Sequence, residues 1–311
     1  MILRLRSFFE VITMNMYDIM ADLRSDSVKN IILDTDAYNE IDDQYAIAYA
    51  MLSGDKVDLL SINAAPFLNS RSTSAADGME KSYNEIFNIR SLVNKDSTVP
   101  VYRGSLEFMK DKKIPVESEA CENIIKTVTE SENFVYVVAI GAITNVASAI
   151  VKCPDICKKM CVVWLGGHAL HFPDVNEFNL KQDVKAAQIV FDSGVPLLVV
   201  PCNGVCTEFR TTVPELEYYL RGKNDLCDYL VDITAAYNRT GAQAWSKVIW
   251  DVTAVAAIVY PESLDMVVMP RPYLTNDCRY AIDNSRPHFI YVRRINRDKL
   301  FADLFTKLAN K

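Results

Sequence analysis

No apolar run in this sequence is long enough to cross a lipid bilayer. The longest runs, such as residues 134–143, span about half of the roughly 20 residues that a membrane helix needs. Positive charge is also in short supply, because 33 Lys and Arg residues stand against 40 Asp and Glu residues, for a net charge of −7. The sequence has no basic stripe that could bind a nucleic-acid backbone. We therefore expect neither a membrane nor a nucleic acid as a partner.

The sequence also contains no complete signal peptide and no common zinc-binding pattern. Residues 1–20 resemble a signal peptide only superficially, because Glu10 interrupts their apolar region and no small-residue cleavage site follows. The eight cysteines lie in apolar surroundings with spacings that match no common zinc pattern, which predicts reduced, buried thiols. No linker, repeat or low-complexity tract divides the chain. We expect a cytoplasmic protein with an N-terminal extension over residues 1–28 and a single domain over residues 29–311.

What the sequence does contain, from residue 30 onward, is an alternation of short β-rich runs with helical patterns. Three of the runs are almost continuously apolar, at residues 134–140, 160–167 and 195–201, as expected of strands covered on both faces. The pattern predicts an α/β fold in which a central, mostly parallel sheet is flanked by helices on both faces. Two further strands and a terminal helix complete the chain. In such sheets ligands bind beyond the carboxyl ends of the strands.

Five carboxylates crowd the end of the first predicted strand. They are Asp34, Asp36, Glu40, Asp42 and Asp43. Helix capping would explain Asp42 or Asp43 but leaves Asp34 and Asp36 unexplained. Such crowding is unfavourable without a cation, and hard oxygen ligands with no His or Cys nearby indicate Ca²⁺ or Mg²⁺.

Two local motifs compete for this cluster. An EF-hand loop that began at Asp34 would need glycine where Asn39 stands and glutamate where Tyr45 stands, so the sequence excludes it. The Asp-x-Asp strand end also suggests a haloacid-dehalogenase-like phosphatase, with Asp34 as nucleophile and Asp36 as acid/base. That family typically has Thr or Val where this chain has Tyr38, and no clear late Gly-Asp-x-x-x-Asp metal motif appears. The phosphatase is the weaker interpretation.

A third match extends along most of the chain. The segment LDTDAYNEIDDQYAIAYA resembles the D-x-D-x-x-x-D-D signature of the inosine-uridine nucleoside hydrolase family. Three later segments, at residues 135–150, 162–191 and 249–261, resemble that family's further strand-end segments, in the same order. One departure is visible, since five residues separate Asp36 from Asp42, two more than the family usually has. The resemblance implies a hydrolase that cleaves the N-glycosidic bond of ribonucleosides.

The resemblance also implies a role for each member of the acidic cluster. It places a Ca²⁺ ion on the carboxylates of Asp36, Asp43 and Asp251 and on the backbone carbonyl of Ile140. Asp42 aligns with the general base that takes a proton from the attacking water. Asp34 would lie behind the ligands and fix the loop.

The remaining substrate contacts are also implied by the resemblance. Glu177 and Asn179 match the ribose-binding segment, and Asn69 is a further candidate ribose ligand; Asn179 could instead cap a helix that starts near residue 181. Trp250 stands where the purine-specific branch of the family has tryptophan and where many members have a proton-donating histidine. Trp245 could lie against the other face of the base, although either tryptophan could be a core residue.

The function predicted from the sequence is thus a calcium-dependent nucleoside hydrolase with purine nucleosides favoured. The small-molecule partner is a nucleoside, and family analogy implies a homodimer or homotetramer. A catalytically silent nucleoside-binding protein of the same fold is the alternative, because the loop is longer and the histidine before Asp251 is absent. His168 and His171 follow Gly166-Gly167 and receive no assigned role, being interpreted as loop histidines.

Overall fold

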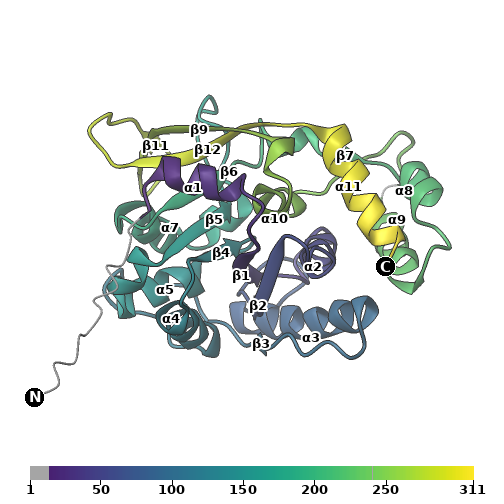
Figure 1. The fold of residues 1–311 in the computed structure, drawn as a ribbon, viewed down its shortest axis with the longest axis horizontal. Coiled ribbons are helices and arrows are strands. Elements are labelled where there is room, and N and C mark those ends of the chain that lie inside the picture. Colours follow the sequence, from purple (N-terminus) through teal and green to yellow (C-terminus); the bar gives the residue numbers. More distant parts are fainter. Residues whose placement is uncertain (1–13, 240) are drawn as a thin grey trace, which may run out of the picture.

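The computed structural model describes residues 14–239 and 241–311. Within them, eight strands form one sheet in the order β3-β2-β1-β4-β5-β6-β12-β9 (Figure 1). All neighbouring strands are parallel except β9, which runs antiparallel to β12 at one edge. The strands are β1 (Lys29–Thr35), β2 (Val57–Ala64), β3 (Val101–Tyr102), β4 (Val135–Ala139), β5 (Met160–Leu165), β6 (Leu197–Val200), β9 (Leu264–Pro270) and β12 (His288–Ile295). The predicted α/β fold with a mostly parallel sheet is confirmed.

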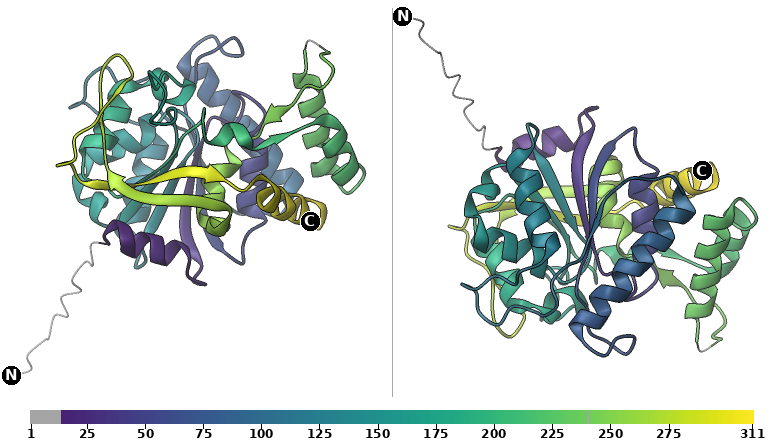
Figure 2. Two further views of the ribbon diagram at one scale, coloured as in Figure 1. Left: turned by 90° about the horizontal axis from the view of Figure 1, so that it is seen from above. Right: turned by 90° about the horizontal axis from the view of Figure 1, so that it is seen from below.

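Helices cover both faces of this sheet (Figures 1 and 2). They are α1 (Met16–Leu23), α2 (Asp43–Met51), α3 (Ala75–Val93), α4 (Glu119–Glu130), α5 (Thr144–Lys152), α6 (Phe178–Gln182), α7 (Val184–Asp192), α8 (Val213–Tyr219), α9 (Asp225–Tyr237), α10 (Val252–Val259) and α11 (Arg297–Ala309). Three short 3₁₀ turns are η1 (Pro154–Lys158), η2 (Cys206–Glu208) and η3 (Pro261–Ser263). Two small two-stranded sheets complete the described part, pairing β7 (Arg210–Thr211) with β8 (Lys247–Val248) and β10 (Tyr273–Leu274) with β11 (Tyr280–Ala281).

Side chains of the central strands alternate between two hydrophobic cores. On β1, Ile31 and Leu33 join the core that α2, α10 and α11 cover, whereas Ile32 joins the core under α4, α5 and α7. Successive residues of a strand point to opposite faces, so a strand buried on both sides must be apolar at every position. This is the physical reason why the central strands read as unbroken apolar runs in the sequence.

Residues 213–237 form two consecutive helices, α8 and α9. Gly222 adopts a φ of 72°, a left-handed conformation that reverses the chain between α8 and α9. The two helices form a hairpin that projects from the body of the molecule beside α11 (Figure 2). Tyr219 of α8 stacks on Phe305 of α11 with ring centroids 5.2 Å apart, which fastens the hairpin to the terminal helix.

Part of the predicted N-terminal extension is packed on the domain. Ile19 and Leu23 of α1 are buried in the core, and the hydroxyl of Tyr136 donates a 2.5 Å hydrogen bond to Asp22. Residues 16–23 therefore contribute to the folded body. Residues 1–13, on which the signal-peptide argument depends, lie outside the described residues. Among the described helices, none is long and apolar enough to span a membrane.

The cysteines are all free thiols, in agreement with the sequence prediction. Six of the eight are buried, and Cys153 and Cys157 are half-buried. Burial raises the pKa of the buried thiols, Cys161 among them, so they pack as small apolar side chains.

Candidate active site

A cavity of 280 Å³ opens at the carboxyl ends of the central strands. It is lined by Asn39, Glu40, Asp42, Ile140, Leu165, His168, Asn176, Glu177, Phe178, Asn179, Cys202, Asn203, Trp250 and Asp251. These residues come from the loops that follow β1, β4, β5 and β6 and from the start of α10. Five segments that lie far apart in the sequence thus meet at the edge of the sheet where an α/β fold places its ligand site.

Four buried carboxylates gather beneath and beside this cavity. They are Asp36, Asp42, Asp43 and Asp251. Burial raises the pKa of Asp36 well above its ordinary value, and the charges of Asp43 and Asp42 raise it further. The pKa of Asp251 is raised in the same way, by burial and then by Asp42 and Asp43. The cluster therefore contains more negative charge than its buried surroundings favour.

Helix capping does not account for this cluster. Asp42 and Asp251 stand at the N-cap positions of α2 and α10, yet neither side chain makes a capping hydrogen bond. Asp43 accepts a 2.5 Å hydrogen bond from the hydroxyl of Thr35, and burial raises its pKa to about 7. The side chains of Asp42 and Asp251 therefore stand at helix ends without capping them.

Cation binding fits the donor chemistry of the cluster. Neither oxygen of Asp36 has a hydrogen-bond partner in another described residue, although both are buried. Unpaired buried carboxylate oxygens are costly, and a hard cation satisfies them. A side chain at Gly141 would come within 3.0 Å of the Asp36 carboxyl carbon, so glycine there leaves the group its space. As they stand, no three Asp, Glu, His or Cys side chains of the described residues are arranged to hold a metal, so binding would require them to turn toward the ion.

Asp34 lies behind the cluster and does not line the cavity. Its Oδ2 accepts a 2.9 Å hydrogen bond from the side chain of Asn145, and the residue is fully buried. A nucleophile must reach its substrate, so this position does not suit the phosphatase interpretation. The placement agrees with a supporting role for Asp34 beneath the loop.

Asp34→Asn is expected to flatten the pH dependence of the metal-free protein's stability. Burial raises the pKa of Asp34 to about 7, whereas an unfolded chain titrates near its ordinary value. The stability from this group is therefore complete below the unfolded pKa and is lost as the pH rises through about 7. Between pH 5 and 8 the parent should lose roughly 2 kcal/mol more unfolding free energy than the variant. Urea unfolding in chelator measures this, and parallel curves for the two proteins would show that Asp34 does not titrate as described.

Glu177 and Asn179 line the cavity and are fixed by hydrogen bonds to backbone groups. Glu177 caps α6: its Oε1 accepts from the backbone N of Asn179, and its Oε2 accepts from those of Gly167 and Leu180. Asn179 lies inside α6, so the alternative in which Asn179 caps a helix is wrong. Its Nδ2 donates to the carbonyls of Ile140 at 3.1 Å and Leu165 at 3.0 Å, which joins the ends of β4 and β5.

Two other predicted substrate residues lie away from the cavity lining. Asn69 donates from Nδ2 to Oδ1 of Asn39 at 2.6 Å, so Asn39 lines the cavity with Asn69 behind it. Trp245 is half-buried in the segment before β8 and is not among the lining residues. Trp250, by contrast, is half-buried and lines the cavity directly beside Asp251.

The histidines divide into one cavity residue and one neighbour. His168 lines the cavity, and its ring lies within 3.4 Å of both the backbone and the side-chain nitrogen of Asn203. Burial lowers the pKa of His168, which favours the neutral ring. His171 contacts Phe172 with ring centroids 4.9 Å apart and does not line the cavity.

Lys247 is one of three residues at the candidate site that the sequence did not indicate. It is buried, it forms an ion pair with Glu40, and its Nζ lies 3.1 Å from Oδ1 of Asp42. It belongs to a polar segment without periodicity, and only its position four residues before Asp251 hints at the site. Asn39 and Asn203 were missed for the same reason, because each becomes a cavity residue only through the loop that carries it.

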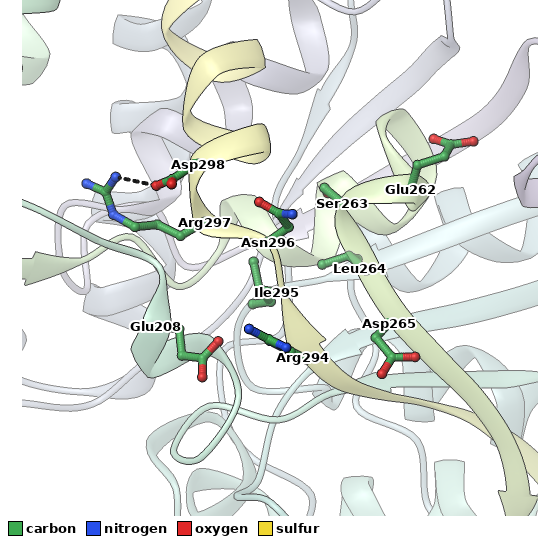
Figure 3. A pocket seen from close by; sticks show the side chains of 10 residues that line it. All are labelled: Glu208, Glu262, Ser263, Leu264, Asp265, Arg294, Ile295, Asn296, Arg297 and Asp298. Carbon is green, nitrogen blue, oxygen red and sulfur yellow. Dashed lines mark hydrogen bonds and ion pairs between the residues drawn. The ribbon is translucent and has the colours of Figure 1, made fainter.

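A larger hollow of 640 Å³ lies between η2, η3, β9 and the start of α11 (Figure 3). Its charged side chains are mostly exposed, and Glu262 and Arg297 point away from one another. Arg297 is already paired with Asp298 and Glu215, and Arg293 of β12 is paired with Asp265. With its charged side chains mostly exposed and half of them paired, this hollow lacks the convergent buried groups of the strand-end cavity.

The family comparison bears directly on this geometry. The model of the family described as inosine-uridine preferring nucleoside hydrolase matches residues 31–300 of the chain. The chain belongs to this family. All five segments that build the cavity fall inside the matched range, and the resemblance seen in the sequence is confirmed. Membership in the nucleoside hydrolase family also removes the phosphatase interpretation.

Relatives of the nucleoside hydrolase family share about half of their length with this chain. A probable uridine nucleosidase 2 of Oryza sativa subsp. japonica is 29% identical over 154 residues, which cover 47% of this chain and 45% of that protein. The pyrimidine-specific ribonucleoside hydrolase RihA of Escherichia coli (strain SMS-3-5 / SECEC) is 28% identical over 173 residues, which cover 47% of this chain and 55% of that protein.

Solved nucleoside hydrolase structures match over nearly the whole chain. A plant nucleoside hydrolase superposes with a TM-score of 0.75 at 20% identity, covering 92% of this chain and 100% of its own. A purine-preferring ribonucleoside hydrolase from Gardnerella vaginalis also gives 0.75 at 20% identity, covering 91% and 98%. At this level of identity the likeness establishes a common fold.

Proposed function

We propose that this protein hydrolyses the N-glycosidic bond of ribonucleosides, with purine nucleosides favoured, and releases ribose and the free base. One observation carries the proposal: a single cavity at the strand ends is lined by Asp42, Asp251, Glu177, Asn179 and Trp250. A carboxylate base, an acidic cluster, two hydroxyl-binding groups and an aromatic ring are the parts that this reaction needs. Membership in the family supports the same reaction class.

The chain's own residues divide the work of the reaction. Asp42 takes the proton of the attacking water, because its carboxylate lines the cavity and makes no capping bond. Both hydrogens of the Asn179 amide are used by backbone carbonyls, so Oδ1 is the atom that this cavity residue can offer to a ribose hydroxyl, as an acceptor. Glu177, pinned by three backbone N–H groups, offers its remaining lone pairs to a second hydroxyl.

Calcium is the cation that we propose for the acidic cluster. Asp36, Asp43 and Asp251 would supply carboxylate oxygens, and Ile140 would supply its backbone carbonyl. The Ile140 carbonyl already accepts from Asn179, but a carbonyl oxygen has a second lone pair for an ion. When bound, the ion would lower the pKa of a coordinated water and hold it near the sugar. The raised pKa values of Asp36 and Asp251 support this proposal, because they show that burial and neighbouring carboxylates disfavour negative charge there. A bound cation would neutralise that charge.

Base specificity is proposed from the place of Trp250. The names of the relatives and neighbours include both pyrimidine-specific and purine-preferring hydrolases, so they do not choose between the two classes. Trp250 presents a large ring to the cavity beside the acidic cluster, where a purine could stack. Stacking would ease protonation of the departing purine.

Reducing-sugar release from a panel of ribonucleosides tests the proposed function. We expect inosine and guanosine to be cleaved faster than uridine and cytidine in calcium, and all activity to stop with chelator. If no nucleoside is cleaved but calorimetry detects nucleoside binding, the protein is the catalytically silent binder. If a pyrimidine nucleoside is cleaved fastest, the purine preference is wrong and the reaction class stands.

We also propose a cytoplasmic homodimer or homotetramer, on the sequence and the family resemblance alone. Analytical ultracentrifugation of the purified chain tests the assembly. A monomer at micromolar concentration would contradict it.

Trp250→Ala is expected to lower turnover on inosine far more than on p-nitrophenyl riboside. Stacking helps only a base that must be protonated in the transition state, whereas nitrophenolate departs unaided. A purely structural tryptophan would behave differently, because its loss leaves a cavity that costs roughly 3 to 5 kcal/mol and depresses both activities alike. Steady-state kinetics on the two substrates and a melting curve distinguish these cases.

Trp245→Ala is the matched control for that experiment. Trp245 does not line the cavity, so its removal should leave the ratio of the two activities at the parent value. If Trp245→Ala shifts this ratio as strongly as Trp250→Ala, both rings hold the base as the sequence predicted. Equal losses on both substrates for Trp250→Ala would return that residue to a packing role.

A further inference from the structure

A buried lysine lies among the carboxylates of the candidate site. Lys247 is 6% exposed and begins β8, the short strand that pairs with β7. Its Nζ forms an ion pair with Glu40, lies 3.1 Å from Oδ1 of Asp42, and sits 5.2 Å from the centre of the Tyr237 ring. Burial alone would lower the pKa of Lys247, but the charges of Asp42 and Glu40 raise it above its ordinary value. The side chain is therefore a cation inside an acidic cluster.

The partner Glu40 belongs to the lengthened loop, which is anchored on its other side. Arg71 donates to the backbone carbonyl of Glu40 at 2.8 Å, and its guanidinium lies 4.3 Å from the centre of the Tyr38 ring. Asn69 holds Asn39 in the same loop. These contacts fix the backbone of the loop, so the Glu40 carboxylate is presented to Lys247 and the lysine is held between two carboxylates.

Two consequences follow from this position. The 3.1 Å ion pair sets the Lys247 cation against Oδ1 of Asp42, although this oxygen has no hydrogen-bond partner among the described residues. The attraction favours one orientation of the carboxylate, with its other oxygen left for a proton. In addition, a fixed positive charge repels any cation that binds the neighbouring carboxylates, since charges interact strongly at short range in a poorly screened interior. One side chain thus affects both the general base and the affinity of the metal site.

We propose that Lys247 is a positioning residue for Asp42 and a built-in counter-ion that weakens cation binding at the acidic cluster. The proposal rests on the proposed function for its kinetic part and on the charge arrangement alone for its cation part. Lys247 thus lowers the affinity of the cluster for a cation and, in the same position, orients the Asp42 carboxylate. Among the ion pairs of the described residues, those of Glu40 and Asp42 are both made by Lys247.

Lys247→Met tests both parts in one protein. We expect calcium to bind at least several-fold more tightly in calorimetry, because two carboxylates lose their counter-ion. On a nucleoside substrate, kcat should fall by about tenfold to a hundredfold with little change in KM, because the base loses its fixed geometry. Lys247→Arg keeps the charge and should restore both values toward the parent. A residue with a purely structural role would instead lose calcium affinity, kcat and melting temperature together.

Lys29→Met is the matched control. Lys29 is equally buried and contacts Asp22, but it begins β1 at the end of the sheet opposite the cavity. Its loss should lower the melting temperature and leave calcium affinity and kcat at parent values. A change in calcium affinity as large as that of Lys247→Met would overturn the proposal.

Glu40→Gln keeps the proposal testable if Lys247→Met fails to fold. With Glu40 neutral, the charge of Lys247 acts wholly on Asp42 and its neighbours, so calcium should bind more weakly than in the parent. Tighter or unchanged binding in this variant would overturn the counter-ion role, and an unchanged kcat in Lys247→Met would overturn the positioning role. If the parent cleaves no nucleoside at all, the proposed function fails, and the calorimetric comparison still decides the counter-ion role.

Discussion

Asp42→Asn is expected to lose about 10²- to 10⁴-fold in turnover with little change in KM. Calcium should still bind, but more weakly than in the parent, because Lys247 loses one of its two carboxylate partners. The carboxylate lines the cavity, makes no capping bond, and has one oxygen held by Lys247. Asparagine has the same shape but cannot take a proton from water, so the loss should fall on the chemical step and not on substrate binding. Steady-state kinetics on inosine, together with calorimetric calcium titration, measures both quantities.

The matched control for Asp42→Asn is Asp183→Asn. Asp183 is also a buried carboxylate, but it accepts hydrogen bonds from Met109 and Thr144 and does not line the cavity. Its change should cost stability and leave turnover nearly intact. If Asp42→Asn turns over at close to the parent rate, another group takes the proton, and Glu40, which lines the same cavity, is the next candidate.

Asp36→Asn, Asp43→Asn and Asp251→Asn are each expected to lose calcium and activity together. Changes to groups that only support a metal ligand cost about 10- to 100-fold in affinity, so the loss of a direct ligand should exceed this range. The metal-free variants should not be less stable than the metal-free parent, because each removes a buried charge that its neighbours repel. A structural defect would lower stability instead.

Calorimetric titration and melting curves with and without calcium measure these effects. Asp58→Asn serves as the control, since Asp58 is exposed near the start of β2, away from the cavity. It should bind calcium like the parent. Undiminished calcium binding in all three cluster variants would remove the metal-site assignment.

Most of the fold could be predicted because burial leaves a clear trace in the sequence. A strand covered on both faces must be apolar throughout, and β4, β5 and β6 carry that signature. The helix at the N-terminus was harder to predict, because α1 owes its place to two buried side chains, Ile19 and Leu23, and not to a long periodic pattern. Short amphipathic helices are stabilised by tertiary packing rather than by their own sequence.

The parts of the site that are built from residues close together in the sequence could be predicted. The parts that depend on contacts between residues far apart in the sequence could not. The acidic run after β1 is local, so its position at the strand end follows from the strand itself. Lys247 reaches Asp42 across more than 200 residues of chain, and no pattern in the intervening segment indicates that contact. The same holds for Asn69, whose amide is taken by Asn39 in a loop of unusual length. Side-chain partners of this kind depend on loop conformation, which sequence periodicity does not describe.

The placement of β12 between β6 and β9 has a consequence for biosynthesis. The strands from β1 to β6 can pair as the chain leaves the ribosome, but the open edge of β6 stays without its partner until residues 288–295 are made. An unpaired strand edge invites association with other chains. Because domains assemble during synthesis at about 5 to 20 residues per second, that edge stays exposed for several seconds in every newly made molecule. Loss of the last two dozen residues would make the exposure permanent, and such a truncated chain should aggregate even though its cavity residues are all present.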